Sequence, residues 1–228
     1  MGFESEAEMK SVAKTVFSNG FTDGPTTVLE EFSYGGGRTD LVLAKESDAY
    51  RQHRQEVLGI EAAIDHDSYL RTFLLLNNRK DVSKQYFYGV GAIDRKTKSK
   101  ALDWLIDNGF INELPGGKIQ TAHNLRRHIT RSYAIELKLK KWKQAVKQAF
   151  RCKSFTDYQF VVIDEDSIIP AIDNIDVFEK FDIGLVSLNE DCEYFVHHEP
   201  KRQDPYSPFR KWKLNETTIW IHRYAKSD

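Results

Sequence analysis

The chain has 228 residues, of which 40% are hydrophobic and 29% are charged. This composition is typical of a folded globular protein and excludes global disorder. The net charge of -1 excludes a chain that is basic throughout, and we expect neither a secretory signal nor a membrane span. Two cysteines, Cys152 and Cys192, are too few for a disulfide framework, which favours a cytoplasmic protein.

Positive charge is concentrated in one segment of the chain. From Arg126 to Lys153 ten residues are lysine or arginine, and Glu136 is the one acid. A local excess of this kind attracts phosphate groups. A solvated helix face is the alternative explanation, and for most basic segments it is the simpler one.

The N-terminal part predicts a helix followed by a hairpin. The expected elements are a helix over residues 3–18, a strand over 26–34, a glycine turn at 35–37 and a strand over 38–44. In the second strand Asp40 shares a face with Val42 and Ala44. A buried carboxylate on such a face is costly unless it binds a cation, although a strand-end turn is the simpler explanation of Asp40 taken alone.

The middle of the chain predicts a polar connecting helix over 48–67 and then a separate module. Its expected elements are a helix over 69–76, a helix capped by Ser83, a helix capped by Asp94 and a hairpin over 110–122. This order, with Leu102, Leu105, Gly109, Phe110 and Ile111 before the hairpin, resembles a winged helix-turn-helix. The resemblance implies that the third helix enters the major groove of DNA with Arg95, Lys96, Lys98 and Lys100 at its leading end. A three-helix packing module is the alternative.

Residues 133–139 predict a strand with an unusual face. Ile135, Leu137 and Leu139 point one way, whereas Glu136 and Lys138 share the other face. The next segment changes to helical spacing and carries basic residues off its apolar stripe of Trp142, Ala145, Val146, Ala149 and Phe150. A strand over 159–164 follows, and strand, helix and strand at this spacing predict a crossover with parallel pairing. The remaining expected elements are a helix over 172–181, a strand over 183–188, an edge strand over 193–198 and a helix over 215–225.

With residues 49–132 set aside, the chain resembles the PD-(D/E)XK, or restriction-endonuclease-like, nuclease superfamily. Asp40 and the triplet Glu136-Leu137-Lys138 carry this resemblance, with Glu6 as a further carboxylate and Thr39 in place of the usual proline. It implies an α/β fold, a restriction-endonuclease-like mixed sheet flanked by helices, with an inserted mainly helical winged-helix domain. The expected domains are residues 1–48 with 133–228 and the insertion 49–132. The strand of Glu136 must then pair beside the strand of Asp40.

The resemblance also implies a chemistry. Asp40, Glu136 and the Leu137 carbonyl would bind Mg²⁺, for which Mn²⁺ can substitute, because Mg²⁺ prefers oxygen ligands. Lys138 would orient the attacking water, Glu6 would bind a second metal or hold Lys138, and Lys141, Gln144 and Gln148 would contact backbone phosphate. We therefore predict a metal-dependent endonuclease that acts on double-stranded DNA and that can act as a homodimer, since cutting both strands usually needs two active sites. A non-catalytic DNA-binding regulator or assembly subunit on the same scaffold is the alternative function.

Overall fold

The computed structural model describes residues 2–20, 26–77 and 79–224. By their internal contacts the residues form two compact units. Unit 1 comprises Met1–Glu46 and Ile129–Lys211, and unit 2 comprises Ser47–His128 and Trp212–Asp228. Among the described residues, no helix is long and apolar enough to cross a membrane.

Unit 1 is built on a mixed six-stranded sheet with the order β1-β2-β6-β7-β8-β9. The strands are β1 (Thr26–Ser33), β2 (Arg38–Glu46), β6 (Ile129–Lys138), β7 (Tyr158–Asp164), β8 (Gly184–Leu188) and β9 (Tyr194–His198). The β6–β7 and β7–β8 pairs are parallel, and the other neighbours are antiparallel. The expected mixed α/β sheet and the expected parallel crossover are therefore both confirmed.

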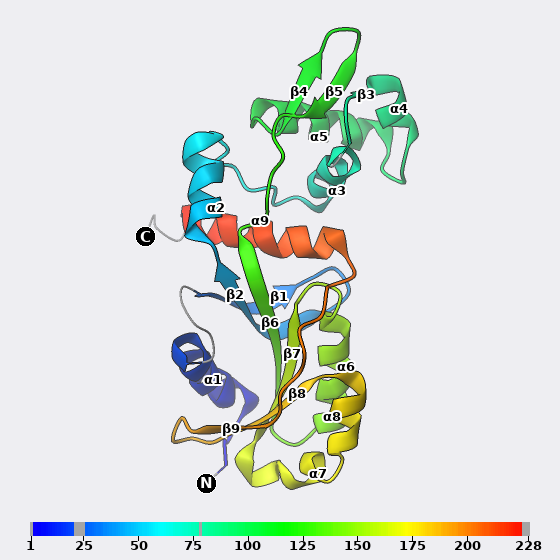
Figure 1. Ribbon diagram of the computed structural model, residues 1–228. Helices are drawn as coiled ribbons and strands as arrows, with labels where there is room; N and C mark the ends of the chain where they lie inside the picture. The colour runs from blue at the N-terminus through cyan, green and yellow to red at the C-terminus, as the bar shows by residue number, and fades with distance from the viewer. Residues whose placement is uncertain (1, 21–25, 78, 225–228) are drawn as a thin grey trace. The chain divides into compact units, whose positions relative to one another are not determined.

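Helices cover both faces of this sheet (Figure 1). The helical elements of unit 1 are α1 (Glu6–Gly20), α6 (Trp142–Cys152), η2 (Glu165–Ser167), α7 (Ile169–Ile172) and α8 (Ile175–Phe181). On one face Met9, Ala13 and Phe17 of α1 pack on Leu41 and Leu137 of the sheet. On the other face α6 and α8 pack on a second apolar cluster that includes Val161 and Ile163. These two cores fix which side of each strand faces which helix.

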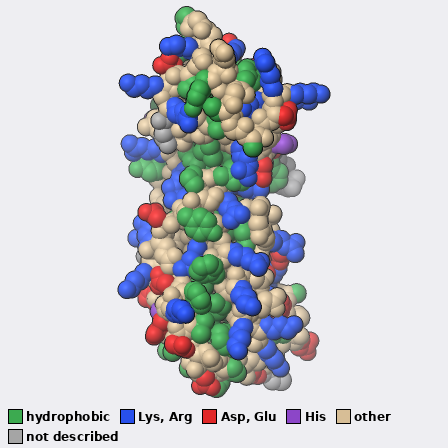
Figure 2. Space-filling view, turned by 90° about the vertical axis from the view of Figure 1, so that its right-hand side faces the viewer, with side chains coloured by type: hydrophobic (Ala, Val, Ile, Leu, Met, Phe, Trp, Pro, Cys, Tyr) green, Lys and Arg blue, Asp and Glu red, His purple; other side chains and the backbone are tan. Residues whose placement is uncertain are grey.

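The side of α6 that faces solvent combines positive and apolar side chains. Figure 2 shows lysine and arginine side chains beside hydrophobic ones on this side of the molecule. Phe150, which the sequence places on the apolar stripe of α6, is 48% exposed. Its ring instead packs edge-on against Phe181 of α8, with ring centroids 5.6 Å apart. Phe150 therefore lies at the exposed edge of the apolar stripe, whereas Trp142, Ala145, Val146 and Ala149 are buried.

Unit 2 contains a small helical body and a three-stranded sheet with the order β3-β5-β4. Its elements are α2 (Asp48–Gln52), η1 (His53–Val57), α3 (Asp67–Leu76), β3 (Val82–Ser83), α4 (Lys84–Gly89), α5 (Arg95–Asp107), β4 (Ile111–Leu114) and β5 (Lys118–Thr121). The two predicted caps are present, since Ser83 accepts a hydrogen bond from the Tyr86 amide and Asp94 accepts one from the Thr97 amide. Phe73, Trp104 and Phe110 pack ring against ring at the centre of the unit.

The connecting helix expected over 48–67 is shorter than predicted. It continues from α2 into one π-helical segment, η1, which ends at Val57, and Gly59 two residues later has a left-handed φ of +66°. The segment that follows is held by Arg54, which donates hydrogen bonds to the carboxylate of Glu216 at 2.7 and 2.8 Å and to the Ala62 carbonyl at 2.7 Å. A buried tertiary ion pair, rather than a local helix, therefore shapes these residues.

The last helix, α9 (Pro208–Tyr224), is longer than the one expected over 215–225, and residue 225 lies outside the described residues. The sequence interpretation assigned the whole of 133–228 to the nuclease-like core. The residues from Trp212 onward belong to unit 2 by their contacts, because Trp212 packs on Phe73 and Glu216 binds Arg54. The boundaries of the insertion fall at residues 46/47 and 128/129 instead of 48/49 and 132/133.

Candidate functional site

The pairing of β2 with β6 brings two of the predicted site residues together. The paired residues end with Leu41 opposite Ile135, next to Val42 opposite Ala134, and this register continued by one residue brings Asp40 beside Glu136. Partners in an antiparallel pair point to the same face of the sheet. Asp40 is further fixed because its Oδ2 accepts a hydrogen bond from the Leu137 amide at 2.8 Å. The expected pairing of these two strands is confirmed.

Glu136 is a buried carboxyl group with few partners. Its side chain is 1% exposed, and the Cys152 thiol of α6 donates to Oε1 at 3.8 Å. Its Oε2 has no hydrogen-bond partner among the described residues. Burial raises the pKa of Glu136 to about 8, and the neighbouring Asp40 carboxylate acts in the same direction. A cation bound beside this carboxyl group would therefore stabilise its ionised form.

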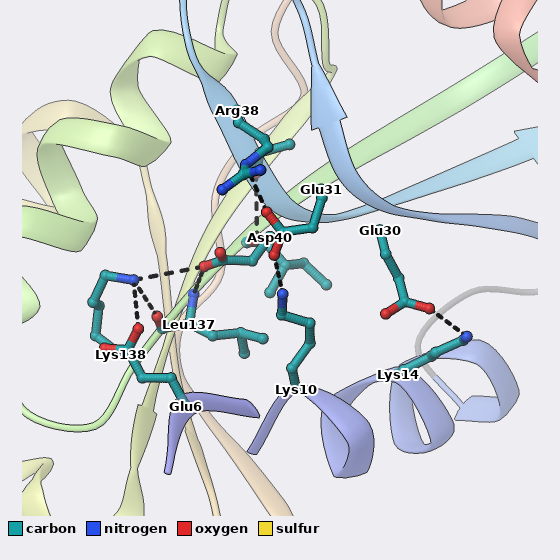
Figure 3. A network of polar contacts seen from close by, with 11 residues as sticks. Glu6, Lys10, Lys14, Glu30, Glu31, Arg38, Asp40, Leu137 and Lys138 are labelled. Atoms are coloured by element: carbon teal, nitrogen blue, oxygen red, sulfur yellow. Dashed lines mark hydrogen bonds and ion pairs between the residues drawn. The ribbon is translucent and has the colours of Figure 1, made fainter. Parts of the chain in front are cut away.

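Lys138 is the last residue of β6, and three oxygen atoms surround its ammonium group (Figure 3). Its Nζ lies 3.2 Å from Oε2 of Glu6, 3.7 Å from Oδ2 of Asp40 and 2.7 Å from its neighbour's carbonyl, that of Leu137. The side chain is 9% exposed. Of the two roles expected for Glu6, the structure places its carboxylate on Lys138. The Leu137 carbonyl, expected as a metal ligand, accepts a hydrogen bond from Lys138.

A pocket of about 480 Å³ opens beside these groups. Its lining residues come from α1, β1, β2, β6 and α6: Glu6, Ala7, Lys10, Glu31, Arg38, Asp40, Leu137 and Gln148. Sequence reasoning missed Lys10, Glu31 and Arg38. Two signals were available, since Lys10 follows Glu6 by one helical turn and Arg38 precedes Asp40 by one strand repeat. No local pattern marks Glu31.

The residues at this site fit a divalent cation. Two neighbouring carboxyl groups match the one or two that Mg²⁺ usually takes while keeping several waters. The partnerless Oε2 of Glu136 and the partnerless Oε1 of Gln148 are both buried, and a hydrated cation would satisfy such atoms. Among the described residues no group of three or more His, Cys, Asp or Glu side chains could hold a metal ion. A metal ion bound among the described residues would therefore have at most two of these side chains as ligands.

The predicted phosphate contacts on α6 separate into two places. Gln148 lines the pocket beside Asp40. Gln144 and Lys141 are exposed and line a shallow depression of about 440 Å³ at the start of α6, together with Lys140 and Lys143. Gln144 and Gln148 therefore do not converge on one point, although they are one helical turn apart.

The four basic residues predicted to contact DNA from α5 also separate. Arg95, Lys96 and Lys100 are exposed. Lys98 is fully buried, and its ammonium group donates to the carbonyls of Phe87, Tyr88 and Val90 around the end of α4. The assignment of Lys98 as a DNA contact was wrong because its ammonium group is buried inside unit 2 and hydrogen-bonded to backbone carbonyls.

Replacing Lys98 with methionine is expected to lower the free energy of unfolding by about 2–4 kcal/mol, since buried carbonyls lose a charged donor. Lys96→Met, at an exposed position on the same helix, is the control and should change stability by less than about 0.5 kcal/mol. Urea denaturation of both variants measures the difference. Equal stabilities would mean that Lys98 is not held as described.

Comparisons with known proteins add little to this geometry. No protein-family model matches the chain, and no curated protein is similar to it. A solved structure, "SPO1766 protein of unknown function from Silicibacter pomeroyi", aligns with 96% of this chain and 91% of its own. The sequence identity is 12% and the TM-score is 0.37, a likeness too low to carry an argument about fold or function.

Proposed function

We propose that this chain is a metal-dependent nuclease with a restriction-endonuclease-like core in unit 1. Its substrate is double-stranded DNA, which it cuts as an endonuclease, acting as a dimer where both strands are cleaved. The observation that carries the proposal is the position of Asp40 beside the end of β6, with its Oδ2 2.8 Å from the Leu137 amide and 3.7 Å from the Lys138 ammonium, at an open pocket. Carboxylates and a lysine in this relation suit hydrolysis of a phosphodiester.

In this proposal Asp40 and Glu136 hold Mg²⁺, or Mn²⁺ in its place. The bound ion would lower the pKa of a water molecule and offset negative charge that develops on the phosphate. Lys138, held by Glu6 and the Leu137 carbonyl, is positioned to donate a hydrogen bond to the attacking water or to a phosphate oxygen. The Cys152 thiol steadies Oε1 of Glu136 and leaves Oε2 free for the ion. Gln148 supplies a polar wall to the same pocket.

Unit 2 is proposed as a winged helix-turn-helix-like module that contacts DNA. Support comes from its order of three helices, α3, α4 and α5, with a three-stranded sheet. Further support comes from the exposed basic side chains of Arg95, Lys96 and Lys100 at the start of α5. Arg95 also lies over the Tyr88 ring, 5.0 Å from its centroid, which fixes the position of this basic side chain. Such a row of cations at the leading end of a helix suits phosphate and base edges in the major groove.

A plasmid-cleavage assay with Mg²⁺ or Mn²⁺ tests the proposed activity. Asp40→Asn and Lys138→Met are each expected to reduce metal-dependent cleavage by about 100-fold or more, because each removes a charge at the reacting phosphate. Lys14→Met, an exposed lysine of α1 that does not line the pocket, is the matched control and should cleave like the parent. Cleavage that survives both site substitutions would contradict the proposal.

The alternative function is a non-catalytic DNA-binding regulator or assembly subunit. The specific observation in its favour is the raised pKa of Glu136, because a protonated carboxyl group near neutral pH is a poor metal ligand. DNA binding without metal-dependent cleavage of duplex DNA, single-stranded DNA or RNA would favour this alternative.

A further inference from the structure

Two cationic side chains of the pocket form ion pairs with one carboxylate. Lys10 of α1 contacts Oε1 of Glu31, and Nε of Arg38 lies 2.7 Å from Oε2 of the same side chain (Figure 3). The three residues come from α1, β1 and β2, and all three line the pocket that contains Asp40. Each carboxylate oxygen therefore has its own positive partner, the arrangement in which two oxygens of a phosphate are also bound.

The backbone of β1 is distorted to present Glu31 in this way. Glu30 and Phe32 keep their regular partners Leu41 and Thr39, whereas Glu31 between them has a φ of +52°. This left-handed conformation is costly for a residue with a side chain. In a regular strand Glu30 and Glu31 would point to opposite faces. Both instead form ion pairs with α1, so the distortion turns Glu31 toward Lys10.

The contact between the three side chains is open to solvent. The side chains of Lys10, Glu31 and Arg38 are 22%, 38% and 67% exposed. Exposed ion pairs contribute little to stability, so the carboxylate can leave its partners at small cost. The two cations that remain would face a pocket that also contains Asp40, and an arginine fork can bind two oxygens of a phosphate as it binds those of a carboxylate.

We propose that Lys10 and Arg38 form a clamp for a backbone phosphate of the nucleic acid, and that the Glu31 carboxylate occupies this clamp until the phosphate displaces it. This inference rests on the proposed nuclease function and names two positioning residues for it. The phosphate in the clamp lies beside the one that reacts, because Asp40 lines the same pocket. The Glu31 carboxylate competes with weakly bound anions for the clamp. It therefore favours ligands whose phosphate backbone continues into the site.

The chain supplies a matched control for this clamp. Lys14 follows Lys10 by one turn of α1 and forms an ion pair with Glu30, the neighbour of Glu31. The two side chains are 50% and 44% exposed, and neither lines the pocket. Lys14→Gln therefore removes one positive charge from the same helix without touching the clamp.

Binding of a labelled DNA duplex, followed by fluorescence anisotropy in EDTA, is the first part of the test. Lys10→Gln and Arg38→Gln should each weaken binding about five- to tenfold. Each should also reduce the magnitude of the slope of the log binding constant against log salt concentration by about one unit. Glu31→Gln should tighten binding about threefold or more, and Lys14→Gln should stay within about twofold of the parent. Equal losses for Lys10→Gln and Lys14→Gln would overturn the clamp, as would weaker binding by Glu31→Gln.

Inorganic phosphate, added to ¹⁵N-labelled protein and followed through the Arg38 Nε–H resonance, is the second part. Phosphate should shift this resonance in the parent and at several-fold lower concentration in Glu31→Gln. A shift without any binding of DNA would show a site for free phosphate only and would overturn the clamp as a nucleic-acid contact. Metal-dependent cleavage by the parent, with no shift in either protein, would overturn the clamp and leave the nuclease standing. Thermal melting of each variant confirms that it is folded.

Discussion

Replacing Glu136 with glutamine is expected to abolish metal-dependent cleavage and, in the absence of metal, to stabilise the protein at pH 8. The loss of activity should reach about 100- to 1000-fold, because a glutamine amide cannot supply the negative charge that a cation needs. The gain in stability follows from the pKa of Glu136, which the fold raises from 4.5 to about 8. One substitution should thus move activity and stability in opposite directions.

The pH dependence has a definite sign. The folded protein keeps the Glu136 proton between pH 4.5 and about 8, whereas the unfolded chain has lost it. The free energy of unfolding therefore falls as pH rises through this window, by about 1.4 kcal/mol per pH unit at its steepest. Glu136→Gln removes this slope, so the variant should match the parent near pH 4.5 and exceed it at pH 8.

Urea denaturation at several pH values in EDTA measures this difference. Glu190→Gln, at an exposed position in the turn between β8 and β9, is the control and should keep the slope of the parent. Parallel curves for the parent and Glu136→Gln would show that Glu136 does not titrate in this window. Addition of Mg²⁺ should stabilise the parent more at pH 8 than at pH 6, since the ion requires the ionised carboxylate.

The second large effect is expected in unit 2. Arg54→Ala should lower the free energy of unfolding of this unit by about 3–5 kcal/mol, because it leaves the Glu216 carboxylate buried without its cation. The two side chains are 3% and 2% exposed, and the Ile64 amide also donates to this carboxylate at 2.9 Å. The guanidinium further lies over the Phe110 ring, 5.4 Å from its centroid.

Hydrogen exchange resolved by segment can locate the loss. Protection should fall in α3, α5 and α9 and persist in β6 and β7 of unit 1. The paired replacement of Arg54 by methionine and Glu216 by leucine should recover most of the stability, since it removes both buried charges. Lys118→Ala, which breaks an exposed pair with Asp81, should cost less than about 1 kcal/mol. If Arg54→Ala and Lys118→Ala lowered the free energy of unfolding by equal amounts, a buried role for Arg54 would be contradicted.

Local patterns were sufficient to predict most of the elements. The alternation at Ile135 and Leu137 and the helical spacing of Trp142 and Ala145 describe β6 and α6 because these side chains pack into the two apolar cores of unit 1. The pairing of β2 with β6 also followed, since a shared chemical role for Asp40 and Glu136 requires it. The elements are features that residues near in sequence decide, whereas the pairing of β2 with β6 joins distant segments and was expected from the chemical role alone.

Long-range contacts account for what the sequence did not predict. The end of the helix after η1 depends on Arg54 reaching Glu216, which is 162 residues away. Lys98 is a nearer case, since the three carbonyls that its ammonium group contacts lie 8 to 11 residues before it and no sequence pattern marks them. Glu31 had no local signal, since its left-handed backbone and its two partners are set by α1 and β2. Such features follow from packing between distant segments, which a single sequence does not display.

The two-part composition of unit 2 has a consequence for biosynthesis. Its first segment, Ser47–His128, leaves the ribosome before the second half of unit 1, but its partner Trp212–Asp228 leaves after unit 1 is fully translated. Until then Arg54 lacks Glu216 and Phe73 lacks Trp212. Because domains tend to fold as units during translation, the inserted segment cannot complete its interior until α9 has been translated. A nascent chain stalled before residue 212 should therefore be the species most dependent on chaperones.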